Sequence, residues 1–343
     1  MTVCFFGNYI PDYPRIIVLK KGLEANGIKV LECHTRKTGF GKYLDLWQQH
    51  RKIKNEYDVL LVTMAAYTLV PFARFIARKK LIFDAFVSLK LSYEDRGIAG
   101  GGFWDVVGSR HADKVLLDTN AQIDYFVSNY NLPHEKFIRV FASANPDIFH
   151  PMSSTPSEKR TFVVHWHGHI VPFHGVETVI AAARLLKEKK DIEFHITTRF
   201  NSKYEKIKRQ AEGLENIRFF PETSYLGLAK AINDSDVVLG IFGANKKAEL
   251  VIPNKIFEAV ACARPVITRD SSAIRELFDE TTMRFCKAAS PKDLADSILA
   301  LYNDANLRKI LSENAHKLFL EKLTPVILGS PVGALVEELA KKS

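Results

Sequence analysis

Residues 251–268, VIPNKIFEAVACARPVIT, combine side chains that could bind a nucleotide. The sequence predicts a helix that starts near Pro253, and proline suits the first helical position. Unpaired N–H groups at a helix start bind phosphate, and Lys255 would add a positive charge. The Glu258 carboxylate could accept hydrogen bonds from two neighbouring ribose hydroxyls. These features predict a nucleoside diphosphate site; the alternative is a scaffold helix with a solvated lysine and a local ion pair at Glu258.

The residues before this helix extend the same prediction. DVVLGIFGANKK, residues 236–247, reads as a strand followed by a loop that carries Gly243, Lys246 and Lys247. A ligand on an open α/β sheet binds beyond the carboxyl ends of the strands, where helices begin. Arg199 ends another expected strand, IEFHITTR, and would add a further cation. Because the protein supplies these cations itself, we expect neither a metal ion nor another cofactor.

Short apolar runs alternate with helical patterns along the whole chain, which predicts parallel sheets covered on both faces. A length of 343 residues exceeds what one core usually serves. The proline- and serine-rich stretch 145–160, NPDIFHPMSSTPSEKR, is a candidate linker. We therefore predict an N-terminal domain over 1–152, a C-terminal domain over 160–322, and a last helix over 323–343 that packs back on the N-terminal domain.

The overall charge favours an anionic partner. The net charge is +9, which suits phosphorylated small molecules, an acidic membrane surface or nucleic acid. The positive charge is dispersed and no nucleic-acid-binding module is recognisable, so nucleic acid is not expected.

The location of the protein is expected to be cytoplasmic. Four scattered cysteines without CxxC spacing indicate free thiols in a reducing compartment rather than a zinc site. The N-terminus lacks the pattern of a signal peptide. The longest uncharged apolar run, Val59 to Ala73, is shorter than the ~20 residues of a membrane helix. It reads as a buried strand, a loop and a helix start.

A cluster of histidines follows the start of the second domain. His165, His167 and His169 alternate along an expected strand, and His174 is nearby. Residues two apart share a strand face, so a metal site is one possibility. No cysteine accompanies the histidines and a glycine-containing loop precedes His174, which favours packing for His165.

Four segments resemble a family 4 glycosyltransferase, a retaining enzyme of GT-B fold that uses nucleotide-activated sugars. The strongest match is GIFGANKKAELVIPNKIFEAVACARPVITRDSSAIREL, which is similar to the donor-binding block of the family. The opening of the family's second domain is similar to HGHIVPFHGVETVIAAARLL. The end of its first domain is similar to ADKVLLDTNAQIDYFVSNYNLPHEKFIRVFASANPDIFHP. GNYIPDYPR occupies its first glycine-bearing loop, so the likeness spans residues 1 to about 320.

The resemblance implies an α/β, GT-B architecture with two Rossmann-like parallel-sheet domains that face each other across a cleft. The N-terminal domain would bind the acceptor and the C-terminal domain the nucleotide sugar. The expected reaction is a metal-independent, retaining, hexosyltransferase-type transfer from a nucleoside-diphosphate sugar to a glycan, lipid-linked or small-molecule acceptor. Polysaccharide or glycolipid biosynthesis would be its setting.

The resemblance also implies a set of donor-binding residues: Gly7, Asn8, His169, His174, Pro221, Glu222, Gly243, Ile252, Pro253, Asn254, Lys255 and Glu258. Glu258 matches the ribose-binding glutamate of the family. This chain departs from the pattern at His169 and His174, where the family has an arginine and a lysine on the diphosphate. The first glutamate of the family would fall at Leu250, one residue after Glu249. Pro253 stands where many members have glycine.

For catalysis we expect Arg199, Lys246, Lys247 and Lys255 to stabilise the negative charge that develops on the leaving phosphate. The resemblance implies that the leaving diphosphate acts as base on the acceptor. Asp84 ends an expected strand, KLIFDAF, and could contact the acceptor hydroxyl or stabilise positive charge on the sugar. It could equally cap a helix or hold a loop.

A basic helix predicted over 41–55, GKYLDLWQQHRKIKN, places Tyr43, Leu46 and Trp47 among lysines and arginines. Such a helix can lie on an anionic membrane, which would place the enzyme peripherally on the inner face. The alternative is a domain helix whose apolar stripe faces the sheet.

Two other functions share the predicted fold. A GT-B epimerase would act on a nucleotide sugar without transferring the sugar, and the histidine-rich HWHGHIVPFHG is compatible with it. A non-catalytic glycosyltransferase-like subunit is the other, because the usual arginine and lysine are replaced.

Overall fold

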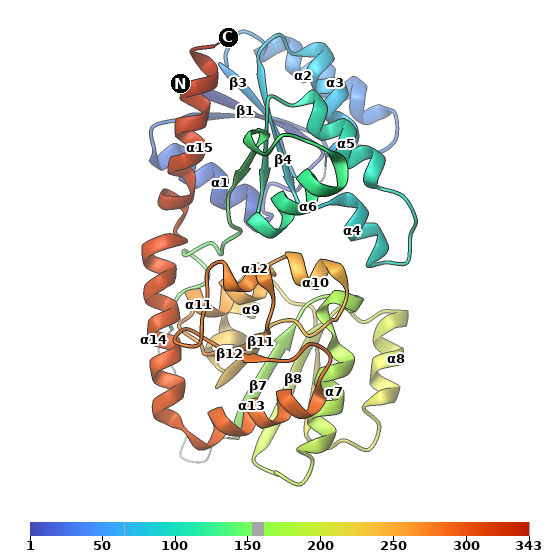
Figure 1. The fold of residues 1–343 in the computed structure, drawn as a ribbon, viewed down its shortest axis with the longest axis vertical. Helices are drawn as coiled ribbons and strands as arrows, with labels where there is room; N and C mark the ends of the chain where they lie inside the picture. The colour runs from blue at the N-terminus through green and yellow to red at the C-terminus, as the bar shows by residue number, and fades with distance from the viewer. Residues whose placement is uncertain (65, 153–160, 343) are drawn as a thin grey trace. The chain divides into compact units, whose positions relative to one another are not determined.

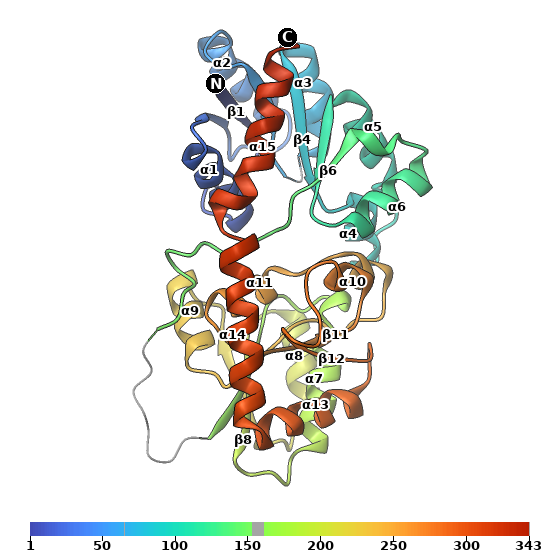
Figure 2. The ribbon, with the colours of Figure 1, turned by 60° about the vertical axis from the view of Figure 1, so that its left-hand side comes forward.

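The computed structural model describes residues 1–64, 66–152 and 161–342, and these residues form two α/β units. One unit contains Met1–Ser143 and Lys322–Ser343, and the other contains Ala144–Glu321. Residues 153–160 of the predicted linker lie outside the described residues. Figures 1 and 2 show the elements of each unit.

The N-terminal unit is built on a six-stranded parallel sheet with the strand order β2-β1-β3-β4-β5-β6. Its strands are mostly apolar, as is typical of a parallel sheet covered on both faces. They are β1 (Thr2–Gly7), β2 (Lys29–His34), β3 (Val59–Val62), β4 (Lys80–Phe86), β5 (Lys114–Leu117) and β6 (Phe137–Arg139).

The helices of this unit follow the strands in turn. They are α1 (Pro14–Ala25), α2 (Gly41–Ile53), η1 (Tyr67–Leu69), α3 (Val70–Ile76), α4 (Leu89–Glu94), α5 (Gly102–His111), α6 (Asn120–Tyr130), η2 (His134–Lys136) and, from the end of the chain, α15 (Pro325–Ala340). The run Val59 to Ala73 contains β3, η1 and the start of α3, in agreement with the prediction.

Helix α15 packs on α1 through two glycines, and the two helices lie side by side in both ribbon views (Figures 1 and 2). A Cβ at Gly22 would lie 2.2 Å from the carbonyl oxygen of Pro325 and 2.9 Å from the Cα of Gly329. The Asn26 amide also donates to the Val326 carbonyl at 2.8 Å. The absence of a side chain at Gly22 and Gly329 therefore lets the two backbones touch.

Replacing Gly22 by alanine should destabilise the N-terminal unit by about 1–3 kcal/mol, because the new methyl group meets backbone that cannot rotate away. Urea unfolding followed by circular dichroism measures the effect. Gly27→Ala is unsuitable as a control because Gly27 has a φ of +77°. Ala25→Gly, at the end of α1, is used instead and measures how far a change of helix propensity alone alters stability. A Gly22→Ala protein as stable as the wild type would contradict this packing.

By length and composition, the stretch Ala305–Ala340 would be long and apolar enough to cross a membrane, with a mean hydropathy of 1.3 in its best window. Half of that window is buried inside the fold. Since α15 packs on α1, we assign it to the core of the N-terminal unit.

The C-terminal unit repeats the plan, with a six-stranded parallel sheet in the order β12-β11-β10-β7-β8-β9. The prediction of parallel α/β sheets is confirmed for both units. The strands are β7 (Phe162–His167), β8 (Ile192–Thr198), β9 (Ile217–Pro221), β10 (Val237–Leu239), β11 (Val266–Arg269) and β12 (Arg284–Cys286).

The helices of this unit cover the sheet around a core that includes Trp166, Phe194 and Phe242. They are η3 (Pro172–His174), α7 (Val176–Leu185), α8 (Ser202–Gln210), α9 (Tyr225–Asn233), α10 (Lys246–Leu250), α11 (Asn254–Ala261), α12 (Ser272–Arg275), α13 (Pro291–Asn303) and α14 (Ala305–Lys322). The four cysteines of the chain are buried free thiols.

Candidate nucleotide-binding site

The start of helix α11 lies by the carboxyl end of β7, since side chains of α11 contact Trp166 and His167. The helix begins at Asn254, one residue later than predicted. Pro253 is its N-cap, with φ −73° and ψ 148°, rather than its first helical residue. The extended ψ of Pro253 explains the shift, because helical geometry requires a ψ near −42°.

Lys255 is a buried cation without a hydrogen-bonding partner. Its side chain is 4% exposed, and its Nζ lies over the Trp166 ring, 4.2 Å from the centroid. Among the described residues this Nζ has no hydrogen-bond acceptor. Burial lowers the pKa of Lys255 to about 7. A buried donor left unpaired is costly, so the site is suited to an anionic ligand that supplies the missing acceptor.

Gly168 lies directly beside this amine. A Cβ there would lie 3.2 Å from Lys255 Nζ and 3.1 Å from His174 Cε1, and its φ is +130°. Any side chain at this position would crowd the amine. Glycine at this position thus keeps a side chain from pressing on Lys255 and His174.

Glu258 lies one turn further along α11 and binds His167. Its Oε2 is 2.8 Å from His167 Nε2, and both side chains are buried. Burial raises the pKa of Glu258 to about 7, although the Lys255 charge acts in the opposite direction. The carboxylate therefore lies close to the buried amine that would bind a diphosphate, as the ribose assignment requires.

The two histidines at the positions of the usual arginine and lysine differ in setting. His169 is exposed. His174 is buried, and its Nδ1 lies 2.6 Å from the His169 carbonyl. Burial, together with the Lys255 charge, lowers the pKa of His174 well below its usual value. A neutral His174 that donates through Nδ1 keeps only an acceptor at Nε2, so it does not replace the lysine as a phosphate ligand.

Gly243, which was predicted to bind the donor, is instead part of the loop packing. Its N–H donates to the Phe173 carbonyl at 3.2 Å, and a Cβ would lie 2.4 Å from the Pro172 carbonyl oxygen. The carbonyl of Gly243 accepts from Arg269 Nη1 at 2.6 Å. Its amide is therefore used within the protein and is not free for phosphate.

Glu249 contacts residues beside the same loop, and both of its carboxylate oxygens accept hydrogen bonds. It binds the Arg269 guanidinium through Oε2 and the Ser272 N–H through Oε1, the latter at 2.8 Å. Leu250, at the position of the first family glutamate, is buried. Neither residue offers a free carboxylate to a donor sugar.

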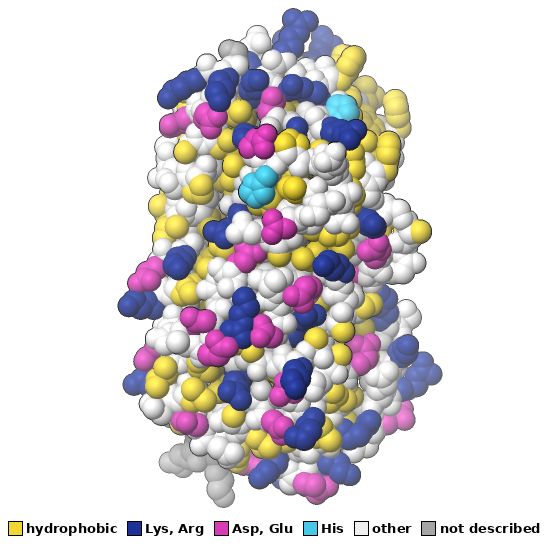
Figure 3. Space-filling model, in the orientation of Figure 1, with side chains coloured by type: hydrophobic (Ala, Val, Ile, Leu, Met, Phe, Trp, Pro, Cys, Tyr) yellow, Lys and Arg dark blue, Asp and Glu magenta, His cyan; other side chains and the backbone are white. Residues whose placement is uncertain are grey.

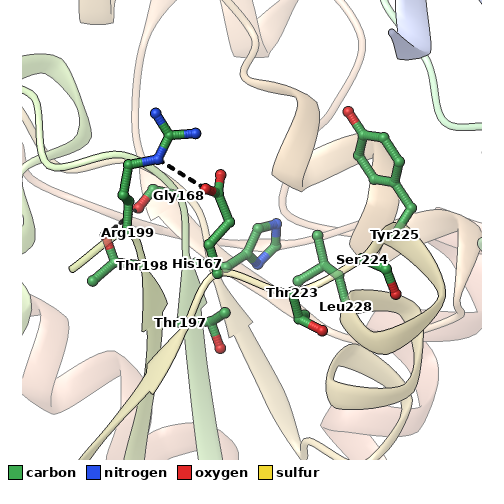
Figure 4. A pocket seen from close by; sticks show the side chains of 10 residues that line it. His167, Gly168, Thr197, Thr198, Arg199, Thr223, Ser224, Tyr225 and Leu228 are labelled. Carbon is green, nitrogen blue, oxygen red and sulfur yellow. Dashed lines mark hydrogen bonds and ion pairs between the residues drawn. The ribbon is translucent and has the colours of Figure 1, made fainter. Parts of the chain in front are cut away.

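A pocket of about 340 Å³ opens at the ends of β7, β8 and β9 (Figure 4). In the close view Thr198 and Arg199 lie on one side, residues of 223–228 lie on the other, and His167 lies between them. Arg199 Nε donates to Glu222 at 2.9 Å on the exposed rim. The positive charge of Arg199 is therefore engaged by another predicted site residue.

The remaining residues predicted for catalysis or donor binding lie in different environments. Lys246 begins α10 and is exposed, whereas Lys247 Nζ lies over the Phe173 ring, 4.5 Å from the centroid. Ile252 is buried, Asn254 is half-buried and Pro221 is exposed at the end of β9. Among the charged residues predicted for the site in this segment, only Lys255 and Glu258 are therefore buried.

In the N-terminal unit, Gly7 and Asn8 follow β1. A Cβ at Gly7 would lie 2.5 Å from Thr63 Oγ1, and Asn8 Nδ2 donates to the Lys37 carbonyl at 2.6 Å. A second pocket of about 560 Å³ lies beside them and is lined by Asn8, Tyr9, Ile10, Tyr13, Ile16, Arg36 and Met64.

The Asp84 carboxylate is paired within the N-terminal unit. Its side chain is fully buried, and its two oxygens accept from Arg15 Nη2 at 2.8 Å and Arg15 Nε at 3.2 Å. Arg15 also donates to the carbonyls of Val140 and Phe141. The predicted acceptor contact is replaced by a structural tie between β4, α1 and the segment after β6.

Sequence reasoning missed His167, Arg269 and Arg15 as partners of the predicted residues. His167 belonged to the histidine cluster, where only spacing was visible. Its ring lies 5.2 Å from that of His165. Within residues 1–64, 66–152 and 161–342, no group of three or more His, Cys, Asp or Glu side chains is arranged to hold a metal ion.

Comparison with solved structures shows a shared fold at low sequence identity. Anabaena Alr3699/HepE in complex with UDP and glucose has a TM-score of 0.76 and 17% identity, with 99% of this chain and 100% of that chain covered. Sucrose-phosphate synthase from Thermosynechococcus elongatus has a TM-score of 0.81 and 12% identity, with both chains fully covered. A glycosyltransferase from Rickettsia africae has a TM-score of 0.75 and 14% identity, over 100% and 99% of the two chains. No curated protein sequence matches the chain.

The two parallel-sheet units therefore form the GT-B fold of nucleotide-sugar-dependent glycosyltransferases, as the resemblance implied. Residues 161–304 match the family model described as Glycosyl transferases group 1. The predicted resemblance to this family is therefore confirmed over these residues of the C-terminal unit.

Proposed function

We propose that this protein is a retaining, hexosyltransferase-type glycosyltransferase that uses a nucleoside-diphosphate sugar. The observation that carries the proposal is the buried, unpaired Lys255 amine one helical turn before a buried carboxylate at the start of α11. A diphosphate would pair with the amine, and the ribose hydroxyls would donate to Glu258. The family match over 161–304 supports this assignment.

Catalysis would come from stabilising the diphosphate as the sugar leaves. Negative charge builds on the leaving phosphate in the transition state, and a cation in a buried site stabilises it more than a solvated one does. Lys255 and the N–H groups at the start of α11 would do this work, with exposed Lys246 contributing less. The leaving diphosphate would take the proton from the acceptor hydroxyl.

A uridine nucleotide is the first donor candidate, because HepE was determined with UDP and with UDP-glucose. A thermal-shift screen against UDP, GDP, ADP and dTDP tests the donor. One nucleotide is expected to stabilise the protein, by about 2.7 kcal/mol at a hundred times its Kd. No shift with any of them would overturn the proposal.

Turnover assays separate this function from its two rivals. A transferase releases free nucleotide only when an acceptor is present, whereas an epimerase keeps nucleotide and sugar joined. Donor binding without turnover across a broad acceptor panel would instead identify a non-catalytic subunit.

For the acceptor we propose the pocket beside β1. Tyr9 and Tyr13 give it flat apolar walls on which a sugar ring could stack, and exposed Arg36 could bind an anionic group of a glycan or lipid-linked acceptor. The Tyr9 hydroxyl is buried and lacks a hydrogen-bond partner among the described residues.

We also propose that helices α2 and α3 contact an anionic membrane. Leu46 is buried and Tyr43 packs edge-on against Phe72 at 5.1 Å, so the apolar stripe faces the protein, as in the alternative interpretation of this helix. Other apolar side chains nevertheless stay exposed beside basic ones: Phe40, Leu44, Trp47 and Phe75, with Lys42, Arg51, Arg78 and Lys79 on the same helices or next to them. Figure 3 shows hydrophobic and basic side chains together where Figure 1 places α2 and α3.

Replacing Phe40 and Phe75 together by serine should abolish flotation with vesicles that contain phosphatidylserine. These side chains are 85% and 88% exposed, so the protein should remain folded. Phe200→Ser, on the C-terminal unit, serves as the matched control. Wild-type protein that fails to float with anionic vesicles, or floats equally with neutral ones, would contradict the membrane proposal.

A further inference from the structure

His167 is placed to control the carboxylate that the proposed function assigns to the ribose. It ends β7, whereas Glu258 comes from α11, and 91 residues of chain separate them. Their hydrogen bond of 2.8 Å joins two buried side chains. No other hydrogen bond to the Glu258 carboxylate is present in the part of the chain that the structure describes.

The charge state of His167 determines which atom donates. Burial, together with the Lys255 charge, lowers the pKa of His167 well below its usual value, so its ring is neutral at pH 7. An ionised carboxylate can only accept hydrogen bonds. Above pH 7, where Glu258 is mostly ionised, the proton of the neutral ring must therefore be on Nε2, and Nδ1 keeps a lone pair. This Nδ1 is buried and lacks a partner among the described residues.

We propose that His167 is a positioning residue for nucleotide binding: its Nε2–H anchors Oε2 of Glu258 and leaves Oε1 to receive the ribose hydroxyls. This inference rests on the proposed function. A glutamate side chain has several rotamers, and the hydrogen bond from His167 favours one of them. A hydrogen bond to the ionised form also favours ionisation at a buried position.

His167 borders the pocket at the ends of β7, β8 and β9 as well. Its unpaired Nδ1 could therefore accept a hydrogen bond from a ligand hydroxyl or N–H group. The same imidazole would then link the carboxylate on α11 to a ligand in the pocket, which a phenyl or aliphatic side chain could not do.

Three variants test the anchor through the Michaelis constant of the donor and the pH dependence of kcat/KM. His167→Val should raise the donor KM about ten- to hundredfold, the worth of a hydrogen bond to a charged group, and change kcat less. His167→Gln keeps an N–H donor and should restore most of the affinity. His165→Val is the matched control. His165 is buried on the same strand, but the proposal gives it no hydrogen bond to Glu258.

The acidic limb of the pH profile gives a second readout. The groups facing the Glu258 carboxylate are His167 on β7, Lys255 on α11 and Cys262 just after this helix. His165 and His195 lie further along the sheet. Losing the anchor should raise the pKa of Glu258 above its present value of about 7. The acidic limb should then move to higher pH in His167→Val and stay in place in His167→Gln.

A measurement on the wild-type protein is independent of variant folding. A long-range ¹H–¹⁵N spectrum at pH 8 should show His167 with its proton on Nε2, with the signal identified by its loss in His167→Gln. A proton on Nδ1, or a His167→Val protein with unchanged KM and acidic limb, would overturn the anchor. If Glu258→Gln loses nucleotide while His167→Val does not, this inference alone fails; if wild-type protein binds no nucleotide, the proposed function fails.

Discussion

Replacing Glu258 by glutamine is expected to weaken binding of the donor nucleotide about ten- to hundredfold, the worth of hydrogen bonds to a charged acceptor. Glutamine keeps the size of the side chain but loses the negative charge and one acceptor oxygen. The helix should remain intact, because Glu258 lies within α11 and only its backbone carbonyl, which the substitution keeps, accepts from the C-cap N–H.

Stability should not fall together with binding. Burial raises the pKa of Glu258 from 4.5 to about 7, so the folded protein binds more protons than the unfolded chain between these values. The stability contributed by this group is therefore present at low pH and is lost as the pH rises through about 7. At pH 8 the folded protein carries the full cost of the buried charge, and Glu258→Gln should be at least as stable as the wild type.

Titration calorimetry with UDP and urea unfolding at pH 8 measure the two quantities. Glu177→Gln is the matched control, because Glu177 is an exposed carboxylate in the first turn of α7. Unchanged nucleotide affinity in Glu258→Gln would remove the ribose assignment. A large loss of stability would show that the carboxylate holds the fold instead.

Replacing Lys255 by methionine should lower kcat/KM about a hundredfold or more, the usual result of removing a group that stabilises developing negative charge. Methionine fills similar space and can pack on the Trp166 ring without a buried cation. The variant should bind UDP weakly but keep whatever affinity the protein has for uridine, because only the diphosphate contacts the amine. Equal losses for both ligands would contradict this role.

The pH dependence of UDP binding gives a second test of Lys255. Burial lowers the pKa of this lysine to about 7, so most of the amines are neutral at pH 8. A bound diphosphate favours the charged form, so binding at pH 8 should take up close to one proton, and affinity should fall as the pH rises above 7. Calorimetry in Tris and HEPES buffers measures this uptake.

Lys246 supplies the comparison for both measurements, because it is exposed at the start of α10. Solvent screens an exposed charge, so Lys246→Met should change affinity less and leave the proton uptake at pH 8 intact. Proton uptake that persists in Lys255→Met would assign the titration to another group.

The sequence predicted the elements around the site well because they depend on local pattern. The apolar strands, the glycine after the first helix and the helix of the VIPNKIFEAVACA block are readable from spacing alone. The error at Pro253 was one residue, since a proline is compatible with both the N-cap and the first turn of a helix.

Predictions of what each side chain does were less secure, because they depend on contacts. Asp84 had the position of a site residue at the end of β4, yet Arg15, 69 residues away in the chain, occupies both its oxygens. Gly243 and Glu249 are likewise used by Arg269 and by the loop around Pro172. No local pattern reveals such pairs.

The sequence by itself determined two α/β units of parallel sheet and a helix start that carries both a lysine and a glutamate. The tertiary structure decided that the Lys255 amine is buried over Trp166 without an acceptor and that Glu258 binds His167. The physical reason is that burial and pairing, which set the charge and the free atoms of a side chain, arise between strands and helices far apart in the chain.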